Sequence, residues 1–259
     1  MRFHKIAVLV SVLAGLGSAR PAMAETTGPL PRFEDPICPG VVGIAVENAE
    51  LLVGRIRQNA QALGRQMAPP ETCEPNLIVS LVGSGQQVLK QMARDRGYIF
   101  DMSPAEFNQV QSEPGPAHVL SVVVTRTRDG MPIHGIPNLS APPQASTWMA
   151  HSRLYSASRR DIVYVLVLFD AAGAKGMTVN QLADYATVRA FVHMAPPTVR
   201  AGDESILNLF EAPPGERPKE LTAFDHALLQ TLYGGIPNLN AAGRLAEIEH
   251  ATGHPLNIK

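Results

Sequence analysis

The sequence predicts an exported α+β protein of one domain, in which helices flank a mixed β-sheet and one disulfide closes the N-terminal side. Three observations predict this: a signal-peptide pattern, an alternation of helix-periodic with valine-rich segments, and a single pair of cysteines. The 259 residues are 45% hydrophobic and 17% charged, a composition typical of folded domains. The net charge of -1 gives no overall basic character of the kind that favours nucleic-acid binding.

Residues 1–24 have the pattern of a secretory signal peptide. A basic start precedes an apolar stretch over residues 6–16, and Ala22-Met23-Ala24 is a small-x-small cleavage site. The apolar stretch is about half the ~20 residues that span a bilayer, so we expect a periplasmic or secreted protein without a membrane span after cleavage. Cleavage leaves 19 of the 22 basic residues against 23 acidic ones, a net charge of -4, which disfavours nucleic acid and anionic membrane as partners.

Export favours a disulfide between Cys38 and Cys73 over two free thiols. In the chain-entropy model a loop of this size is stabilised by roughly 4 kcal/mol. The alternative, a reactive or metal-binding pair, needs nearby histidines or a C-x-x-C spacing, and the sequence has neither. Upstream of the bridge, residues 25–37 are expected to be an extended lead-in to a globular domain over residues 38–234.

The first half of this domain alternates helices and strands. Apolar residues at three- and four-residue steps over residues 49–63 predict one long helix that Gly64 stops. A buried strand is expected over residues 76–82. Two short helices follow, one over residues 84–94 and one that begins with the capping box at residues 103–106.

The middle of the chain is rich in valine. Residues 118–127 predict a strand that ends at the turn Asp129-Gly130. Residues 131–147 contain four prolines and no hydrophobic period, so they are expected to form a long surface loop. Residues 153–156 and 161–169 are expected to pair as a hairpin whose second strand is buried.

The last third is expected to be helical. Thr178 caps a helix to about Met194, where prolines follow, and a second capping box opens a helix over residues 222–234. Residues 235–259 are expected to be a C-terminal tail with a weaker helical stretch over residues 241–252.

Other motifs in the sequence do not add a site. Gly83-Ser84-Gly85 matches neither the dinucleotide fingerprint nor the Walker loop, so Ser84 is interpreted as a helix cap. No G-x-S-x-G elbow is present for a Ser-His-Asp hydrolase. His250 and His254 have the spacing of a metal-binding pair, but Gly253 is expected to end the helix between them.

The order of a buried strand, a helix, a turn and a last helix resembles zinc metallopeptidases of the metzincin type. Residues 205–210, Ser-Ile-Leu-Asn-Leu-Phe, resemble their Met-turn, with Leu207 where methionine would stand. Residues 221–234 resemble their closing helix, which commonly begins Leu-Thr/Ser-x-x-Asp and ends Leu-Tyr-Gly. The chain is also similar to uncharacterised secreted bacterial proteins that share its Ile-Cys-Pro-Gly and Ile-Leu-Asn-Leu-Phe stretches. The resemblance implies a zincin-like fold with a degenerate site.

The zinc ligands of that family are not in this sequence. With His193 as the third ligand, Ala183 and Thr187 stand where the paired histidines would be, and Asp184 stands in the place of the base glutamate. Without a bound zinc no water is activated near neutral pH. We therefore expect no catalytic residue, no metal and no cofactor, and keep Asp184 and His193 as a candidate degenerate site.

Three functions remain open. The first is a pseudo-enzyme, a non-catalytic zincin-like protein that binds a peptide or an envelope component. The second is a metal-dependent hydrolase or peptidase with unconventional ligands, in which Asp184, His193 and His226 or a tail histidine converge. The third is a structural or assembly component of the envelope, which a large exposed apolar patch would indicate. A purely structural interpretation of residues 178–194 is also open, because a histidine at a helix C-terminus is favourably placed against the helix dipole.

Overall fold

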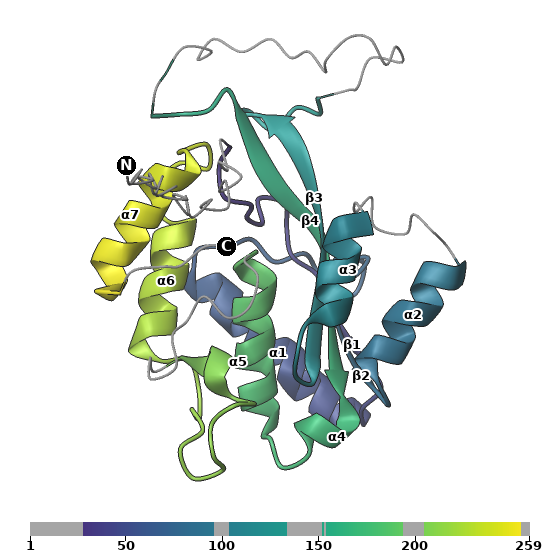
Figure 1. Ribbon diagram of the computed structural model, residues 1–259. Helices are drawn as coiled ribbons and strands as arrows, with labels where there is room; N and C mark the ends of the chain where they lie inside the picture. Colours follow the sequence, from purple (N-terminus) through teal and green to yellow (C-terminus); the bar gives the residue numbers. More distant parts are fainter. Residues whose placement is uncertain (1–27, 96–103, 134–151, 153, 194–204, 255–259) are drawn as a thin grey trace, which may run out of the picture.

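The computed structural model describes residues 28–95, 104–133, 152, 154–193 and 205–254. Within these residues four strands form one mixed sheet, and helices cover both of its faces (Figure 1). The expected mixed sheet flanked by helices is therefore confirmed. The expected disulfide between Cys38 and Cys73 is also confirmed, and it closes a sequence separation of 35 residues.

The sheet has the strand order β1-β2-β4-β3. Its strands are β1 (Pro39–Val42), β2 (Leu77–Val82), β3 (Ala117–Thr127) and β4 (Ser158–Asp170). β1, β2 and β4 run parallel, whereas β3 pairs antiparallel with β4 over its whole length. A helix, α1 (Val46–Ala62), connects β1 to β2, as a parallel pair requires. One edge of the sheet is therefore a long antiparallel strand.

The hairpin expected between residues 153–156 and 161–169 is wrong. β4 is a central strand that pairs with β3 on one side and β2 on the other, and residues 154–157 form no strand. Its continuous apolar run reflects burial of both faces. β1 has no signal in the sequence because four residues are too few to show a period.

Helices on the two faces of the sheet bury two separate cores (Figure 1). The larger core lies under α1, α5 (Val179–Phe191), α6 (Ala223–Tyr233) and α7 (Ala241–Thr252). The smaller core lies under α2 (Gly85–Asp95) and α3 (Pro104–Ser112). A short helix α4 (Ala171–Ala174) and a 3-10 turn η1 (Ile206–Asn208) complete the described elements.

The helix ends follow the local sequence signals. Gly64, with a φ of 68°, lies just after α1, where the sequence predicts a stop. Thr178 and Thr222 each form a capping box at the start of α5 and α6. α5 ends at Phe191, so the described part of this helix is shorter than the expected one to Met194, which lies outside the described residues.

The two terminal segments are parts of the larger core. Residues 28–37, which we call the strap, bury Phe33 and Ile37 completely and form bridges to Asp161 of β4 and to Asn240. α7 lies in the segment expected to be a tail, yet it packs on α6 and buries Ile248. The described parts of the lead-in and of the tail, residues 28–37 and 235–254, are therefore integrated into the fold.

Some expectations lie outside the described residues. These are the signal peptide over residues 1–24 and most of the loop expected over residues 131–147. In the part of the chain that the structure describes, no helix has both the length and the apolar character needed to cross a membrane.

Candidate functional site

Asp184 is completely buried where α5 packs against α1. Arg55 donates from Nε and Nη2 to the two carboxylate oxygens at 2.8 Å each, and Asn59 Nδ2 donates at 2.7 Å. The backbone N–H of Leu221 donates a fourth hydrogen bond at 3.1 Å. A carboxylate has about four acceptor positions. Asp184 therefore has no capacity left for a metal or a reacting water, and it acts as a junction between α1, α5 and the start of α6.

The neighbouring positions on α5 are also buried. Ala183 and Thr187, which would correspond to the paired zinc ligands, are both inaccessible to solvent. Thr187 Oγ1 accepts from Asn59 Nδ2 at 3.2 Å and donates to the Ala183 carbonyl at 2.8 Å. The face of α5 that would carry ligands in the metzincin pattern is therefore packed against α1.

His193 lies two residues beyond the end of α5 and is partly buried. It lines a cavity of about 10 Å³, close to the smallest volume that holds one water molecule. The cavity walls come from the strap, α5, α6 and α7: Leu30, Pro31, Val192, Leu232 and Ile248. Burial, followed by the positive charge of Arg160, lowers the pKa of His193 to about 4, while Glu106 opposes this shift. The imidazole is therefore neutral near pH 7.

The structure does not bring Asp184 and His193 together. Seven residues of helical rise, roughly 10 Å, separate Asp184 from the end of α5 at Phe191, and His193 lies two residues further. His226 lies exposed on α6. No group of three His, Cys, Asp or Glu side chains within the described ranges is arranged to hold a metal ion. The unconventional ligand set of Asp184, His193 and His226 therefore does not form.

The two segments that carry the metzincin resemblance are joined by one buried carboxylate, that of Asp225. Its Oδ1 accepts from Ser205 Oγ at 2.6 Å. Its Oδ2 accepts from the backbone N–H groups of Ile206 at 2.8 Å and Thr222 at 2.9 Å. The turn before η1 is therefore fixed to the start of α6.

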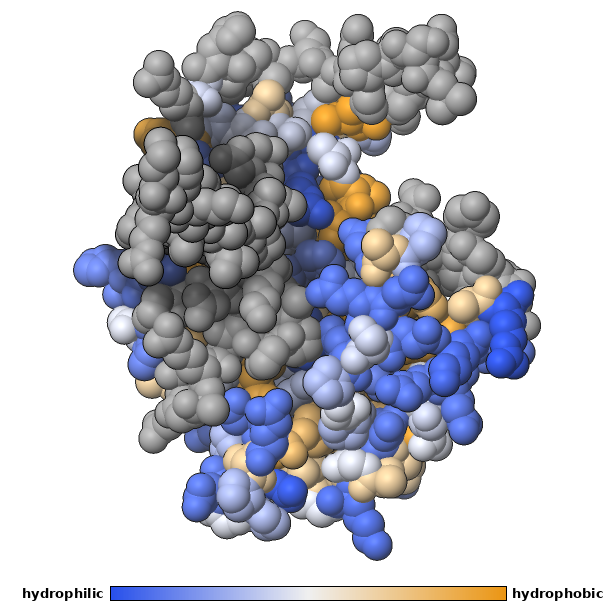
Figure 2. Space-filling model, in the orientation of Figure 1, coloured by the Kyte–Doolittle hydropathy of each residue, from blue (hydrophilic) through white to orange (hydrophobic). Residues whose placement is uncertain are grey.

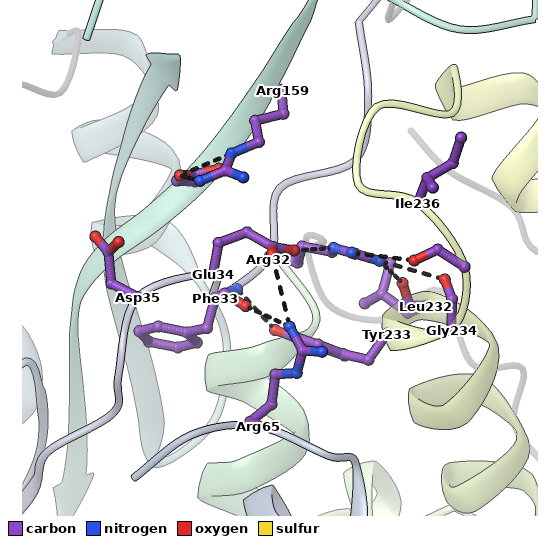
Figure 3. Close-up of polar contacts among 12 residues, drawn as sticks. Arg32, Phe33, Glu34, Asp35, Arg65, Arg159, Leu232, Tyr233, Gly234 and Ile236 are labelled. Carbon is purple, nitrogen blue, oxygen red and sulfur yellow. Dashed lines mark hydrogen bonds and ion pairs between the residues drawn. The ribbon is translucent and has the colours of Figure 1, made fainter. Parts of the chain in front are cut away.

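A network that the sequence does not reveal anchors the strap to the end of α6. Arg32 is buried and donates to the carbonyl oxygens of Leu232 at 3.1 Å and Gly234 at 3.3 Å, while Glu34 pairs with its Nε (Figure 3). The last carbonyls of a helix need donors, and Arg32 supplies them. The only local signal is an arginine between prolines, because the carbonyl groups that it binds are about 200 residues away in the chain.

Tyr233 holds the same junction from the other side. Its hydroxyl accepts from the Phe33 N–H and donates to the Phe191 carbonyl, each at 3.1 Å. The guanidinium of Arg65 lies 5.5 Å from the centre of its ring, within cation–π range (Figure 3). Burial raises the pKa of Tyr233, so the hydroxyl keeps its proton. This cluster is structural.

Three charged residues follow one another at the beginning of β4: Arg159, Arg160 and Asp161. Asp161 is completely buried and pairs with Arg159 at 2.9 Å and with Arg126 of β3 at 3.1 Å. Desolvation raises the pKa of Asp161. Arg160, by contrast, is half-buried and makes no ion pair or hydrogen bond with a side chain that the structure describes.

In the part of the chain that the structure describes, β3 is an edge strand of the sheet, and its outer side faces away from β4. Val122, Val123 and Val124 are half-buried and Thr125 is exposed. Within the described residues only a single bridge, from Arg126 to Pro132, pairs with that side. Figure 2 shows apolar residues above α3, at the level of the β3–β4 hairpin, and a mainly hydrophilic surface over α2 and α3.

A scan against models of protein families, a search of curated proteins and a search of solved structures each find no match. No relative therefore supplies an activity, a ligand or a fold family for this chain. Of the sequence-predicted site residues, Asp184 is saturated and enclosed, whereas His193 lines a small cavity.

Proposed function

We propose that this chain is a non-catalytic zincin-like binding protein, exported to the periplasm or beyond the cell, that binds an extended peptide along β3. The observation that carries the proposal is the open outer side of this strand. Between Ala117 and Thr125 it contains no acidic or basic residue other than a histidine, and its centre is three half-buried valines.

An open strand edge normally carries features that prevent pairing with other chains, such as lysine, proline or very short length. β3 is 11 residues long and has neither lysine nor proline. An added peptide strand would bond to the outward N–H and C=O groups, and the valines would contact alternate side chains of that peptide. These features favour a binding edge over a protected one.

The zincin-like part of the proposal is supported by the order of the elements. An antiparallel edge strand and a parallel central strand precede α5, and the turn at residues 205–210 is joined to α6 through Asp225. The enclosed face of α5 supports the non-catalytic part. The alternative, a metal-dependent hydrolase, has less support because Asp184 already accepts four hydrogen bonds.

The test uses the mature protein from residue 25, with its disulfide oxidised and without a histidine tag. A random peptide library displayed on phage is selected for binding, and the affinity of the selected peptides is measured by fluorescence polarisation. Elemental mass spectrometry after dialysis measures bound metal. Failure to select any peptide, or near-stoichiometric zinc, would overturn the proposal.

Thr125→Pro is the discriminating variant. The Thr127 N–H bonds outward to the Met131 carbonyl, and N–H groups alternate sides along a strand, so the Thr125 N–H also points away from β4. Proline there removes a donor that an added strand needs but no hydrogen bond to β4. We expect Thr125→Pro to weaken peptide binding at least about 10-fold, the loss of about 1.4 kcal/mol. Thr125→Val keeps the N–H and should bind like the parent; equal affinities of the two variants would contradict the edge-binding mode.

A further inference from the structure

Two valines of β3 belong to neither core in the part of the chain that the structure describes. Leu120 packs in the smaller core and Val123 packs against the larger one. The register skips one residue of β4 beside Val122 and Val123, so the alternation of side chains along β3 is not interrupted. Val122 and Val124 therefore point to the face that α2 and α3 cover, yet both are half-buried outside that core. We call Val122 and Val124 the outer valines.

The chain itself pairs with the outer side of β3 just beyond the outer valines. The Thr127 N–H donates to the Met131 carbonyl at 2.9 Å, and Pro132 forms an antiparallel bridge with Arg126. This side of β3 therefore accepts an antiparallel segment. An added strand in line with that segment would meet it beyond Thr125, so the ligand cannot extend past this point.

An added antiparallel strand would come close to the outer valines. Because the Thr127 N–H points outward, the N–H groups of Val123 and Thr125 also point outward, whereas those of the outer valines point to β4. Ligand residues opposite the outer valines would therefore form pairs without hydrogen bonds. In such pairs the Cα atoms are about 4.5 Å apart, against about 5.5 Å in hydrogen-bonded pairs, so the side chains are closer.

The surroundings of the outer valines favour apolar side chains. Between residues 117 and 125 the only ionisable side chain of β3 is that of His118, which is completely buried. Arg126, the next residue on the same face, already pairs with Asp35 and Asp161. A charged ligand side chain on the outer valines would lose water without gaining a partner on β3, which is costly. Aromatic and β-branched side chains opposite valine stabilise a strand pair.

We propose that the ligand of β3 is a peptide with two apolar residues separated by one residue, and that these two side chains pack on the outer valines. The residue between them points to the other face of the sheet, beside Val123 and the exposed Thr125, where a polar side chain keeps contact with water. This inference rests on the proposed function and adds a sequence requirement to it: an uncharged, alternating strand.

The test compares two peptides of the same composition. They are the amides of fluorescein-Gly-Thr-Ile-Thr-Ile-Thr and fluorescein-Gly-Thr-Ile-Ile-Thr-Thr, and each is titrated with oxidised mature protein and followed by fluorescence polarisation. In an extended chain the first peptide has both isoleucines on one side, whereas the second has them on opposite sides. We expect the alternating peptide to bind at least 10-fold more tightly than its isomer. Equal affinities, or no saturable binding of the alternating peptide, would overturn the proposal.

Variants of β3 connect this preference to the outer valines. The double variant Val122→Thr, Val124→Thr keeps the β-branched shape but replaces one methyl group of each side chain by a hydroxyl. It should weaken binding of the alternating peptide about 10-fold and remove its advantage over the isomer. If the double variant does not fold, Val124→Thr alone should weaken binding about 3-fold.

The matched control is Val123→Thr. Val123 is half-buried on the same strand but points to the opposite face, so this variant should keep the preference for the alternating peptide. Circular dichroism confirms that each variant is folded. A folded double variant that distinguishes the two peptides as the parent does would contradict the assignment to the outer valines.

Two further outcomes separate this inference from other occupants of the edge. Peptides from the phage selection that are weakened by Thr125→Pro but lack the alternating apolar pair would overturn the inference while the proposed function stands. Sedimentation velocity of the protein without peptide tests a second copy of the chain. A dimer that the double variant dissociates would overturn the peptide as the occupant of the outer valines.

Discussion

Arg160 and Asp184 are two charged residues with different surroundings. Arg160 is half-buried, whereas Asp184 is completely buried. Asp184 accepts four hydrogen bonds and contributes to the cohesion of the larger core. Arg160 has no such set of partners among the described residues. Buried charges without partners are uncommon because their desolvation is costly.

His193 predicts a pH dependence of stability. Its pKa is about 4 in the folded protein against an ordinary value of 6.5, mainly because of burial and then because of the charge of Arg160, whereas Glu106 opposes these effects. The unfolded chain therefore binds a proton that the folded chain rejects, so stability present above pH 6.5 is lost as the pH falls towards 4. The surrounding Leu30, Pro31 and Leu232 add no charge.

The size of this effect is about 2 kcal/mol between pH 8 and pH 5, by the linkage relation for one group. The measurement is urea unfolding of the parent and of His193→Gln at both pH values, because glutamine keeps a polar side chain that does not titrate. The parent should lose about 2 kcal/mol more than the variant over this range. Equal losses in the two proteins would show that His193 binds a proton as readily in the folded state as in the unfolded chain.

At the scale of elements, Asp184 ties three pieces of chain together: α1 through Arg55 and Asn59, α5 through its own backbone, and the start of α6 through Leu221. Asp184→Asn keeps the volume of the side chain but loses the charge that pairs with Arg55. We expect a loss of about 2–4 kcal/mol, because breaking a buried pair leaves the partner uncompensated.

The matched control is Glu220→Gln. Glu220 also lies near Arg55, at 3.6 Å, but its side chain is 72% exposed. Exposed ion pairs contribute about 0–1 kcal/mol, so this variant should unfold almost like the parent in urea. A similar cost for the two variants would mean that Arg55 does not need its buried partner.

The elements that the sequence predicts best are those with local signals. The stripe of Leu52, Ile56 and Ala60 and the stop at Gly64 define α1, and the Thr222 capping box defines the start of α6. β4 was misinterpreted as half of a hairpin because a strand buried on both faces carries no information about its partners.

The candidate site was predictable to a smaller extent. The Cys38–Cys73 bridge follows from compartment and cysteine count. The roles of Arg32 and Asp184 do not, because their partners are about 200 and about 130 residues away in the chain. His193 was identified from a motif register, whereas the cavity that it lines depends on the packing of the strap, which has no periodic signal.

At the scale of the whole molecule, the disulfide connects the strap and β1 to the segment that leads into β2. Cys38 is almost completely buried, and its N–H donates to Asn76 Oδ1 at 2.8 Å, while its carbonyl accepts from the Asn76 N–H at 3.0 Å. These bonds keep the two segments together even without the sulfur–sulfur bond. The bridge should therefore act mainly by restricting the unfolded chain.

The corresponding prediction concerns the double variant Cys38→Ser, Cys73→Ser. We expect it to fold with the same far-UV circular dichroism spectrum but to lose about 2–4 kcal/mol of unfolding free energy in urea, as for a loop of 35 residues. Dithiothreitol should shift the parent to the midpoint of the double variant and leave the variant unchanged. A folded variant with the same free energy of unfolding as the parent would contradict this role of the bridge.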